Sequence, residues 1–237
     1  MRRFQIRSAM TLVELLVVLA ILAVLLALTI PAIMRVREVA NRAKCANHLH
    51  QMGIALIQYS DARGAFPNGC SYSGPLEPTP HMTWLTRLLP YIEQDALWQE
   101  ALNAFRTAPF FERPAHRPVL GRVIETYTCP SDPRTLTPLK IYSYAIVEGE
   151  RKDLIEIGLT GYLGVVGVNQ SARNGVLFLN SKVRLAQVTD GTSQTIIVGE
   201  RPPSSDRAFG WWYAGWGQNK DGSGDSVMGV RETCFTT

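Results

Sequence analysis

Charged residues are absent from Leu15–Ile33, a run of nineteen residues near the start of this 237-residue chain. A helix of that length, at 1.5 Å per residue, is long enough to cross the apolar core of a bilayer. Acidic residues are absent from the first nine positions, which contain three arginines. Because positive charge flanks the cytoplasmic side of membrane segments, we predict a transmembrane segment over about residues 12–33, with the N-terminus in the cytoplasm.

The patterns that usually carry catalysis are also missing. The sequence has no recognisable nucleophile with its base, no pair of catalytic carboxylates and no phosphate-binding loop. The four cysteines form no C-x-x-C, and the four histidines do not combine with them at finger-like intervals, which disfavours a structural zinc site. We therefore expect no enzymatic activity and no cofactor, apart from the calcium candidate described below.

Excess charge is confined to the first nine residues. The net charge of +4 falls to +1 when the three arginines of this leader are set aside. No basic run with interleaved aromatic residues appears elsewhere, so nucleic acid is not an expected partner.

Glu14 is the only acid in the apolar segment, close to its start. A carboxylate costs about 2.5 to 3.5 kcal/mol at the centre of a membrane helix and less near the interface, so it is normally kept where a partner neutralises it. A basic leader, the small residue Ala9, then Met10, Thr11, Leu12, a hydrophobic residue and Glu14 make up this region. This pattern resembles the cleavage and methylation motif of type IV prepilins.

The resemblance implies that a prepilin peptidase cleaves between Ala9 and Met10 and methylates the new α-amine of Met10. Ala9 stands where the family usually has Gly. Glu14 would then neutralise the amine of a neighbouring subunit and fix the register between stacked helices. The alternative is an ordinary secretory signal or an uncleaved anchor, in which Glu14 is tolerated near the interface.

The predicted helix continues beyond the membrane. Pro31 lacks a backbone donor, so a kink is expected near residues 27–31. Apolar residues then recur at steps of three and four, at Val36, Val39, Ala43, Ala46, Leu49, Met52, Leu56 and Tyr59. Arg63 and Gly64 supply a C-cap, and Pro67 prevents continuation. We predict a leader over residues 1–9, a spine helix over 10–62 and a globular domain over 63–237.

The globular domain is expected to contain short helices and an antiparallel sheet. Residues 83–105 read as a short helix, a proline break and a second helix. Short β-rich segments follow, over residues 122–128, 141–147, 162–168, 175–179, 195–198 and 209–213. The predicted fold class is α+β, with a long N-terminal helix, first transmembrane and then amphipathic, packed on this domain.

Several segments together resemble the prepilin-type processing-associated H-X9-DG proteins, pilin-like proteins with an uncharacterised C-terminal domain. These are residues 44–49, 89–94, 127–133, 143–145, 174–178 and 190–200. Asn180 stands where the His of the H-X9-DG pattern would fall.

The family motif ends in Asp190, Gly191, Thr192 and Ser193. An Asp-Gly step followed by two hydroxyl residues favours a tight turn before a strand, with the side chains bonding nearby amides. A ligand-binding or peptidase-recognition site is the alternative.

Four cysteines, Cys45, Cys70, Cys129 and Cys234, lie on the predicted outer side, where thiols can oxidise. Up to two disulfides can form, and the sequence leaves three pairings open. The family resemblance favours Cys45 with Cys129, because both fall in segments that it covers. Such a bridge would staple the spine helix to the domain.

Two C-terminal segments suggest ligands. Asn219, Asp221 and Asp225 place oxygen ligands at intervals in a glycine-rich loop that could accept calcium, although a plain solvated loop explains them too. The aromatic residues before this loop read either as a sugar-stacking platform or as core. They are Phe209, Trp211, Trp212, Tyr213 and Trp216.

The resemblance implies a pilin-like or pseudopilin subunit, anchored in the inner membrane and assembled through its N-terminal helix into a fibre or secretion pseudopilus. Its C-terminal domain would lie outside the cytoplasm. The implied partners are other pilin-like subunits or further copies of this chain, the prepilin peptidase and the inner membrane. The alternative is a monomeric membrane-tethered surface module that recognises a glycan through its tryptophans.

Overall fold

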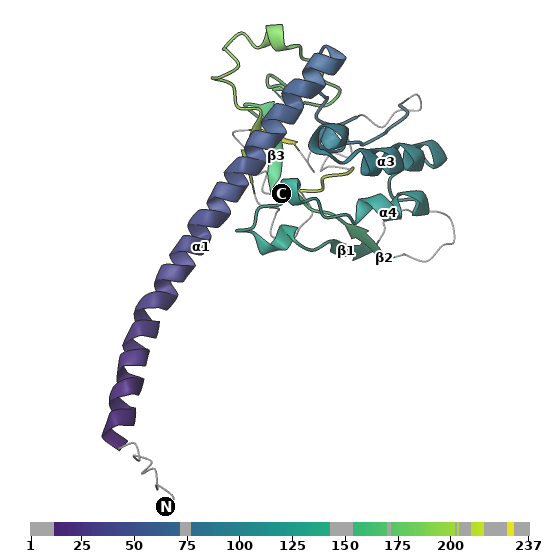
Figure 1. Ribbon diagram of the computed structural model, residues 1–237. Helices are drawn as coiled ribbons and strands as arrows, with labels where there is room; N and C mark the ends of the chain where they lie inside the picture. Colours follow the sequence, from purple (N-terminus) through teal and green to yellow (C-terminus); the bar gives the residue numbers. More distant parts are fainter. Residues whose placement is uncertain are drawn as a thin grey trace, which may run out of the picture. The chain divides into compact units, whose positions relative to one another are not determined.

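The computed structural model describes residues 12–71, 77–142, 154–169, 172–201, 203, 210–215 and 227–229. The chain divides into two compact units, Met1–Arg42 and Ala43–Thr237. Helix α1 (Leu12–Arg63) passes from the first unit into the second, so the division lies inside a helix (Figure 1). The predicted boundaries after residues 9 and 62 stay predictions.

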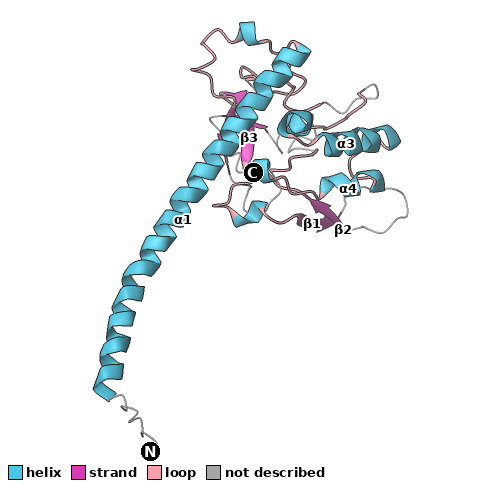
Figure 2. Ribbon diagram, viewed as in Figure 1, coloured by secondary structure: helices cyan, strands magenta, loops and turns pink. Residues whose placement is uncertain are grey.

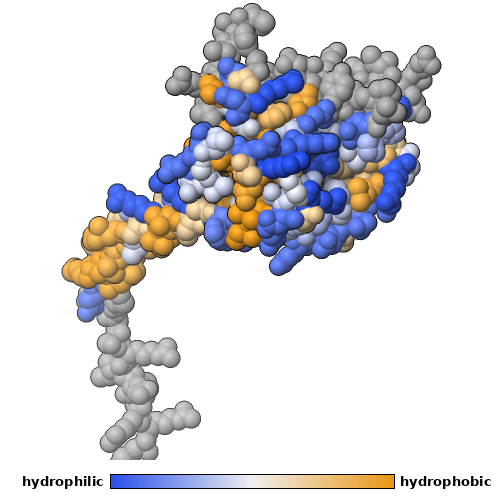
Figure 3. All heavy atoms as spheres, turned by 90° about the horizontal axis from the view of Figure 1, so that it is seen from above, coloured by the Kyte–Doolittle hydropathy of each residue, from blue (hydrophilic) through white to orange (hydrophobic). Residues whose placement is uncertain are grey.

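In the first unit, α1 is apolar and exposed. Its large apolar side chains from Leu12 to Val39 are accessible in the isolated chain. Figure 3 shows apolar residues gathered along this part of the helix. By length and composition, α1 is the one helix in the described part of the chain that could cross a membrane. The helix continues through Pro31, and the kink expected there stays a prediction.

In the second unit, the end of α1 packs into the domain through one face. The buried side chains are Cys45, His48, Met52, Ala55, Leu56 and Ser60, at spacings close to one helical turn. Of the other residues in the predicted apolar pattern, Val36, Val39, Ala43 and Ala46 are exposed. The predicted C-cap is confirmed: Gly64 has φ +76° and donates its N–H to Ser60 O at 2.7 Å.

The predicted pair of helices is also confirmed. Helix α2 (Trp84–Leu88) begins at Thr83, whose hydroxyl accepts the N–H of Thr86 at 3.3 Å. The proline break is a 3₁₀ turn, η1 (Leu89–Ile92), and helix α3 (Asp95–Thr107) follows (Figure 2). The remaining helical elements are short: η2 (Pro114–His116), α4 (Arg117–Leu120), η3 (Glu125–Tyr127), η4 (Pro133–Thr135) and η5 (Leu185–Gln187).

Two small sheets complete the domain and confirm the α+β class. Strands β1 (Leu139–Tyr142) and β2 (Leu154–Ile157) pair antiparallel. Strand β3 (Tyr162–Gly167) lies at the centre of the second sheet. It pairs antiparallel with β4 (Val198–Glu200) and parallel with β5 (Val227–Gly229).

Several strand predictions were wrong. Residues 122–128 contain the 3₁₀ turn η3 instead of a strand, because the Tyr127 ring enters the core and its hydroxyl donates to Leu85 O at 2.7 Å. Residues 175–179 lie beside β3 without forming a regular strand; there Gly175 N–H donates to Val166 O at 2.7 Å. In place of the strand predicted at 209–213, Trp211 forms an isolated bridge with Leu159, and residue 209 lies outside the described residues.

Two other strands are displaced from their predicted positions. The strand placed at 195–198 is found at Val198–Glu200. The one placed at 141–147 is found at Leu139–Tyr142, and residues 143–147 lie outside the described ranges.

The core is built around large aromatic side chains. Trp84, Tyr127, Tyr162, Trp212 and Tyr213 are all fully buried. Segment 211–214 is held against the start of α2 by hydroxyls: Thr83 donates to Trp212 O, and Thr86 donates to Tyr213 O at 2.6 Å. These bonds satisfy carbonyls that burial would otherwise leave costly.

Candidate functional site on the N-terminal helix

Glu14 is the one acid in the membrane-length part of α1, and it lies near the start of the helix. Glu14 lies in the first helical turn, where a carboxylate interacts favourably with the helix dipole. The predicted cleavage residues Ala9 and Met10 lie outside the described residues. The structure therefore presents the apolar helix and Glu14, while processing at Met10 stays a prediction.

Charge returns abruptly after the apolar stretch. Arg35, Arg37, Arg42 and Lys44 are exposed on α1. Glu38 accepts from Arg42 at 3.1 Å, one helical turn away. An exposed pair of this kind contributes only about 0.3 to 0.5 kcal/mol. The return of charged side chains is expected where a helix leaves the apolar core of a bilayer.

A disulfide joins the last third of α1 to the body of the domain. Cys45 and Cys129 are bonded, with Cα atoms 5.3 Å apart, and both side chains are buried. This is the pairing that the family resemblance favours. The bond links residues 84 positions apart in the sequence. It therefore ties the start of the packed segment of α1 to the loop after η3.

Two hydrogen bonds accompany this covalent link. His48, one turn after Cys45, donates from Nδ1 to Thr128 O at 2.9 Å. The Tyr162 hydroxyl donates to Cys45 O at 3.3 Å. Burial, with a smaller contribution from the charge of Glu200, raises the pKa of Tyr162, so this phenol stays a donor at physiological pH. The disulfide and these two hydrogen bonds thus hold a single turn of α1, from Cys45 to His48, against the domain.

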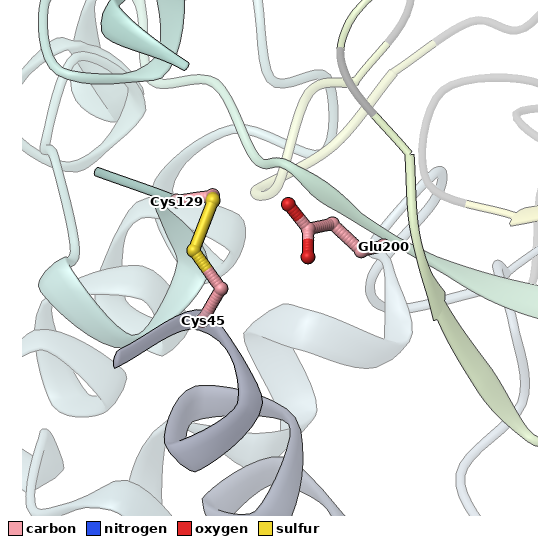
Figure 4. Close-up of side chains that lie close together, drawn as sticks. All are labelled: Cys45, Cys129 and Glu200. Atoms are coloured by element: carbon pink, nitrogen blue, oxygen red, sulfur yellow. A yellow bond between two sulfur atoms is a disulfide. The ribbon is translucent and has the colours of Figure 1, made fainter. Parts of the chain in front are cut away.

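Glu200 lies beside the disulfide (Figure 4). It is directly opposite Tyr162 in the β3–β4 pair, so both side chains are on one face of the sheet. One of its carboxylate oxygens and the two sulfur atoms lie within 4.8 Å of one another. Cys45 and Cys129 are buried, whereas Glu200 is exposed. In the oxidised protein the sulfurs bond each other and offer no thiolate to a metal.

Sequence reasoning missed His48, Tyr162 and Glu200 as members of this site. His48 follows Cys45 by three residues and so shares its helix face, which is a signal that the spacing contained. Glu200 is the last residue of the family segment 190–200, but nothing in the sequence indicates that it pairs with Tyr162. Its place depends on the register of β4 against β3.

The family turn motif forms the tight turn that its sequence favours. Gly191 has φ +91°, a region open to glycine, and Gln194 N–H donates to Gly191 O at 3.0 Å. The Thr195 hydroxyl also donates to Gly191 O at 3.0 Å. Asp190, Thr192 and Ser193 are exposed on this turn, and β4 follows it. The alternative of a ligand or peptidase site is not tested by this geometry.

The second disulfide that the sequence allows stays a prediction. Cys70 is buried, its Sγ donates to Ser71 O at 3.6 Å, and its backbone forms isolated bridges with Thr83 and Leu179. Cys234 lies outside the described residues, as do the calcium candidates Asn219, Asp221 and Asp225.

Two residues of the aromatic segment belong to the core. Trp212 and Tyr213 are fully buried, and the Trp212 indole donates to Arg122 O at 2.8 Å. Trp211 is half-buried, while Phe209 and Trp216 lie outside the described residues. Two of the five rings are therefore closed to a ligand by packing.

These features define an α+β protein with an anchor-like N-terminal helix. The chain belongs to a family described as SBP_bac_10, protein of unknown function (DUF1559), whose model matches residues 34–234. This family is found with type IV pilin-like proteins. Comparison with curated proteins and with solved structures finds no significant match.

Proposed function

We propose that this chain is a pilin-like or pseudopilin subunit. It is anchored in the inner membrane by α1, with its C-terminal domain outside the cytoplasm, and it assembles through α1 into a fibre or secretion pseudopilus. The observation that carries the proposal is the first half of α1, whose apolar side chains are exposed to the surroundings from Leu12 to Val39. Such a surface needs lipid or other apolar helices around it.

Membrane and fibre are two environments for the same surface. In a bilayer, α1 satisfies its own backbone hydrogen bonds and exposes apolar side chains to lipid. In a fibre, α1 helices from other copies or from other pilin-like subunits would replace the lipid. Exchange between the two requires little net change in apolar burial, so polar contacts would decide the register.

Glu14 is the group we assign to that register. Prepilin peptidase cleavage after Ala9 would create a methylated cationic amine on Met10. The Glu14 carboxylate of one subunit would neutralise the Met10 amine of its neighbour in a low-dielectric setting, where a buried charge without a partner is strongly destabilising.

The C-terminal domain would be the exposed working surface of the assembly. We propose a structural and binding role for it without enzymatic activity. Its cysteine link keeps α1 attached when the helix is pulled from the membrane. Calcium at Asn219, Asp221 and Asp225 stays a candidate.

Replacing Glu14 tests the proposal. In cells, Glu14→Ala should leave the amount of membrane-bound protein unchanged and remove it from the sheared filament fraction. Glu38→Ala is the matched control, because this acid lies on the same helix in an exposed pair and should leave assembly intact. Recovery of Glu14→Ala in filaments at the wild-type level would refute the pairing role.

Mass spectrometry of the mature N-terminus tests processing separately. A chain that begins at N-methylated Met10 supports action of the prepilin peptidase. An intact Met1, together with a monomeric state at high concentration in lipid, would instead favour the membrane-tethered binding module.

A further inference from the structure

Three potential metal ligands from distant parts of the chain meet beside α1. Cys45 comes from the helix, Cys129 from the loop after η3, and Glu200 from the end of β4. One ligand atom from each lies within 4.8 Å of the other two. Figure 4 shows the Glu200 carboxylate beside the sulfur atoms. This inference is independent of the proposed assembly.

Hydrogen bonds other than the disulfide hold these elements together. The His48–Thr128 and Tyr162–Cys45 bonds fix α1 against residues 127–129 and against β3. Two further hydrogen bonds join the segment before β3 to the segment that carries Cys129. Gly161 N–H donates to Tyr127 O at 2.9 Å, and the Thr160 hydroxyl donates to the same oxygen at 3.0 Å. None of these hydrogen bonds involves a sulfur atom, so we expect the two thiols to stay close to each other when the S–S bond opens.

We propose that the reduced form of this site binds a zinc ion through Cys45, Cys129 and Glu200. Two thiolates and one carboxylate are ordinary zinc ligands, and water would complete a tetrahedral set. The cation would also offset the repulsion among three adjacent anionic groups. The spacing of the cysteines and histidines in the sequence gives no sign of this zinc site. Its three ligands are distant in sequence and meet only in the fold.

The chemistry balances with a dithiol as the reductant. The dithiol gives two electrons and two protons to the Cys45–Cys129 bond and itself becomes a disulfide. Zinc then binds the two sulfurs as thiolates, and the two thiol protons pass to solvent. A disulfide oxidant reverses the exchange: it takes two electrons from the two thiolates and two protons from solvent and becomes a dithiol, while the Cys45–Cys129 bond forms again and the ion is released. The link between α1 and the domain is thus maintained by a covalent bond when oxidised and by zinc when reduced.

The test uses the full chain in detergent micelles, with Cys70 and Cys234 replaced by Ala so that Cys45 and Cys129 are the two cysteines that remain. The protein is reduced with a phosphine, desalted without oxygen and titrated with Co²⁺, then with Zn²⁺ in competition. We expect one Co²⁺ per chain, with the intense visible bands of a tetrahedral site and thiolate-to-cobalt charge transfer. The oxidised protein should show neither.

Two variants isolate the carboxylate. Glu200→Ala should weaken Zn²⁺ binding by at least about tenfold, since even outer-shell partners of metal ligands are worth about 10- to 100-fold. Glu156→Gln is the matched control, an exposed strand glutamate paired with Lys140 at 3.2 Å, and should leave the affinity unchanged.

Three results would overturn the proposal: no stoichiometric metal binding by the reduced chain, equal affinity in Glu200→Ala, or binding that persists in Cys45→Ser/Cys129→Ser. Circular dichroism follows the fold throughout. If the reduced chain unfolds without metal, Zn²⁺ must restore the fold, and failure to do so would equally contradict the site.

Discussion

Removal of the disulfide gives the sharpest measure of how α1 is held to the domain. Changing Cys45 and Cys129 together to Ala deletes a link across 84 positions of sequence. The chain-entropy relation assigns about 4.6 kcal/mol at 25 °C to a closed loop of this length. Measured losses for native disulfides are commonly about 2 to 5 kcal/mol, so we expect the free energy of unfolding to fall by about 3 to 5 kcal/mol.

Urea unfolding of the full chain in detergent, followed by tryptophan fluorescence, provides the assay. Trp84 and Trp212 are fully buried, so unfolding of the domain changes their surroundings. The variant should also show a steeper dependence on urea, because its unfolded chain is less compact. A chelator in all samples excludes stabilisation by metal.

Reduction of the wild-type protein in the same buffer is the control. It should reproduce the stability of the double variant, because both lose the same link. A loss below about 1 kcal/mol would contradict the loop-closure argument and would indicate that the unfolded chain is already restricted without the disulfide.

Two further predictions concern the core. The pKa of His116 is lowered by burial, with Nε2 donating to Ala108 O and Nδ1 accepting from the Tyr213 hydroxyl. Its contribution to stability is therefore complete above the unfolded pKa of about 6.5 and is lost as pH falls toward the lower folded value, by at most about 1.4 kcal/mol per pH unit. Urea midpoints between pH 7.5 and 5 should show this slope, and His116→Gln should flatten it; an unchanged slope would assign the effect to another group. Gly158→Ala should cost about 3 kcal/mol, because a Cβ there would overlap the backbone oxygen of Arg122 and the Trp212 indole, whereas Gly199→Ala, with open space around it, should be tolerated. Equal urea midpoints for the two glycine variants would contradict the packing at Gly158.

The sequence was most informative where one local signal dominates. Nineteen uncharged residues predict the apolar helix, and Gly64 ends it where a left-handed residue is needed. Pro90 separates α2 from α3 because it cannot continue a helix. Each of these outcomes depends on a few neighbouring residues, so no tertiary information is required.

Tertiary contacts overrode local pattern elsewhere. Residues 122–128 have the composition of a strand, yet Tyr127 is drawn into the core and bonded to Leu85 O, which fixes a 3₁₀ turn. The apolar pattern on α1 also includes Val36 and Val39, which are exposed, whereas Met52 and Leu56 of the same pattern are buried. Periodicity shows which residues share a helix face, but not which of them are covered in the fold.

The cysteine site shows the same limit for function. The Cys45–Cys129 pairing was accessible only through family resemblance, since four cysteines allow three pairings. Glu200 joins the site because β4 pairs with β3 in one register; a shift by a single residue would turn its side chain to the other face of the sheet. Candidate ligands that meet in this way leave no spacing signature.

The position of the disulfide along α1 suggests why this residue of the helix carries it. The domain unit begins at Ala43, and Cys45 is the first buried side chain of α1 within it. Any tension on the apolar half of the helix therefore reaches Cys45 before it reaches Met52 or Leu56, whose attachment rests on packing alone. A covalent bond at the entry point takes that load first, and His48 and Tyr162 reinforce it within the same turn. A link placed near Ser60 would instead let the packed segment peel away before it came under tension.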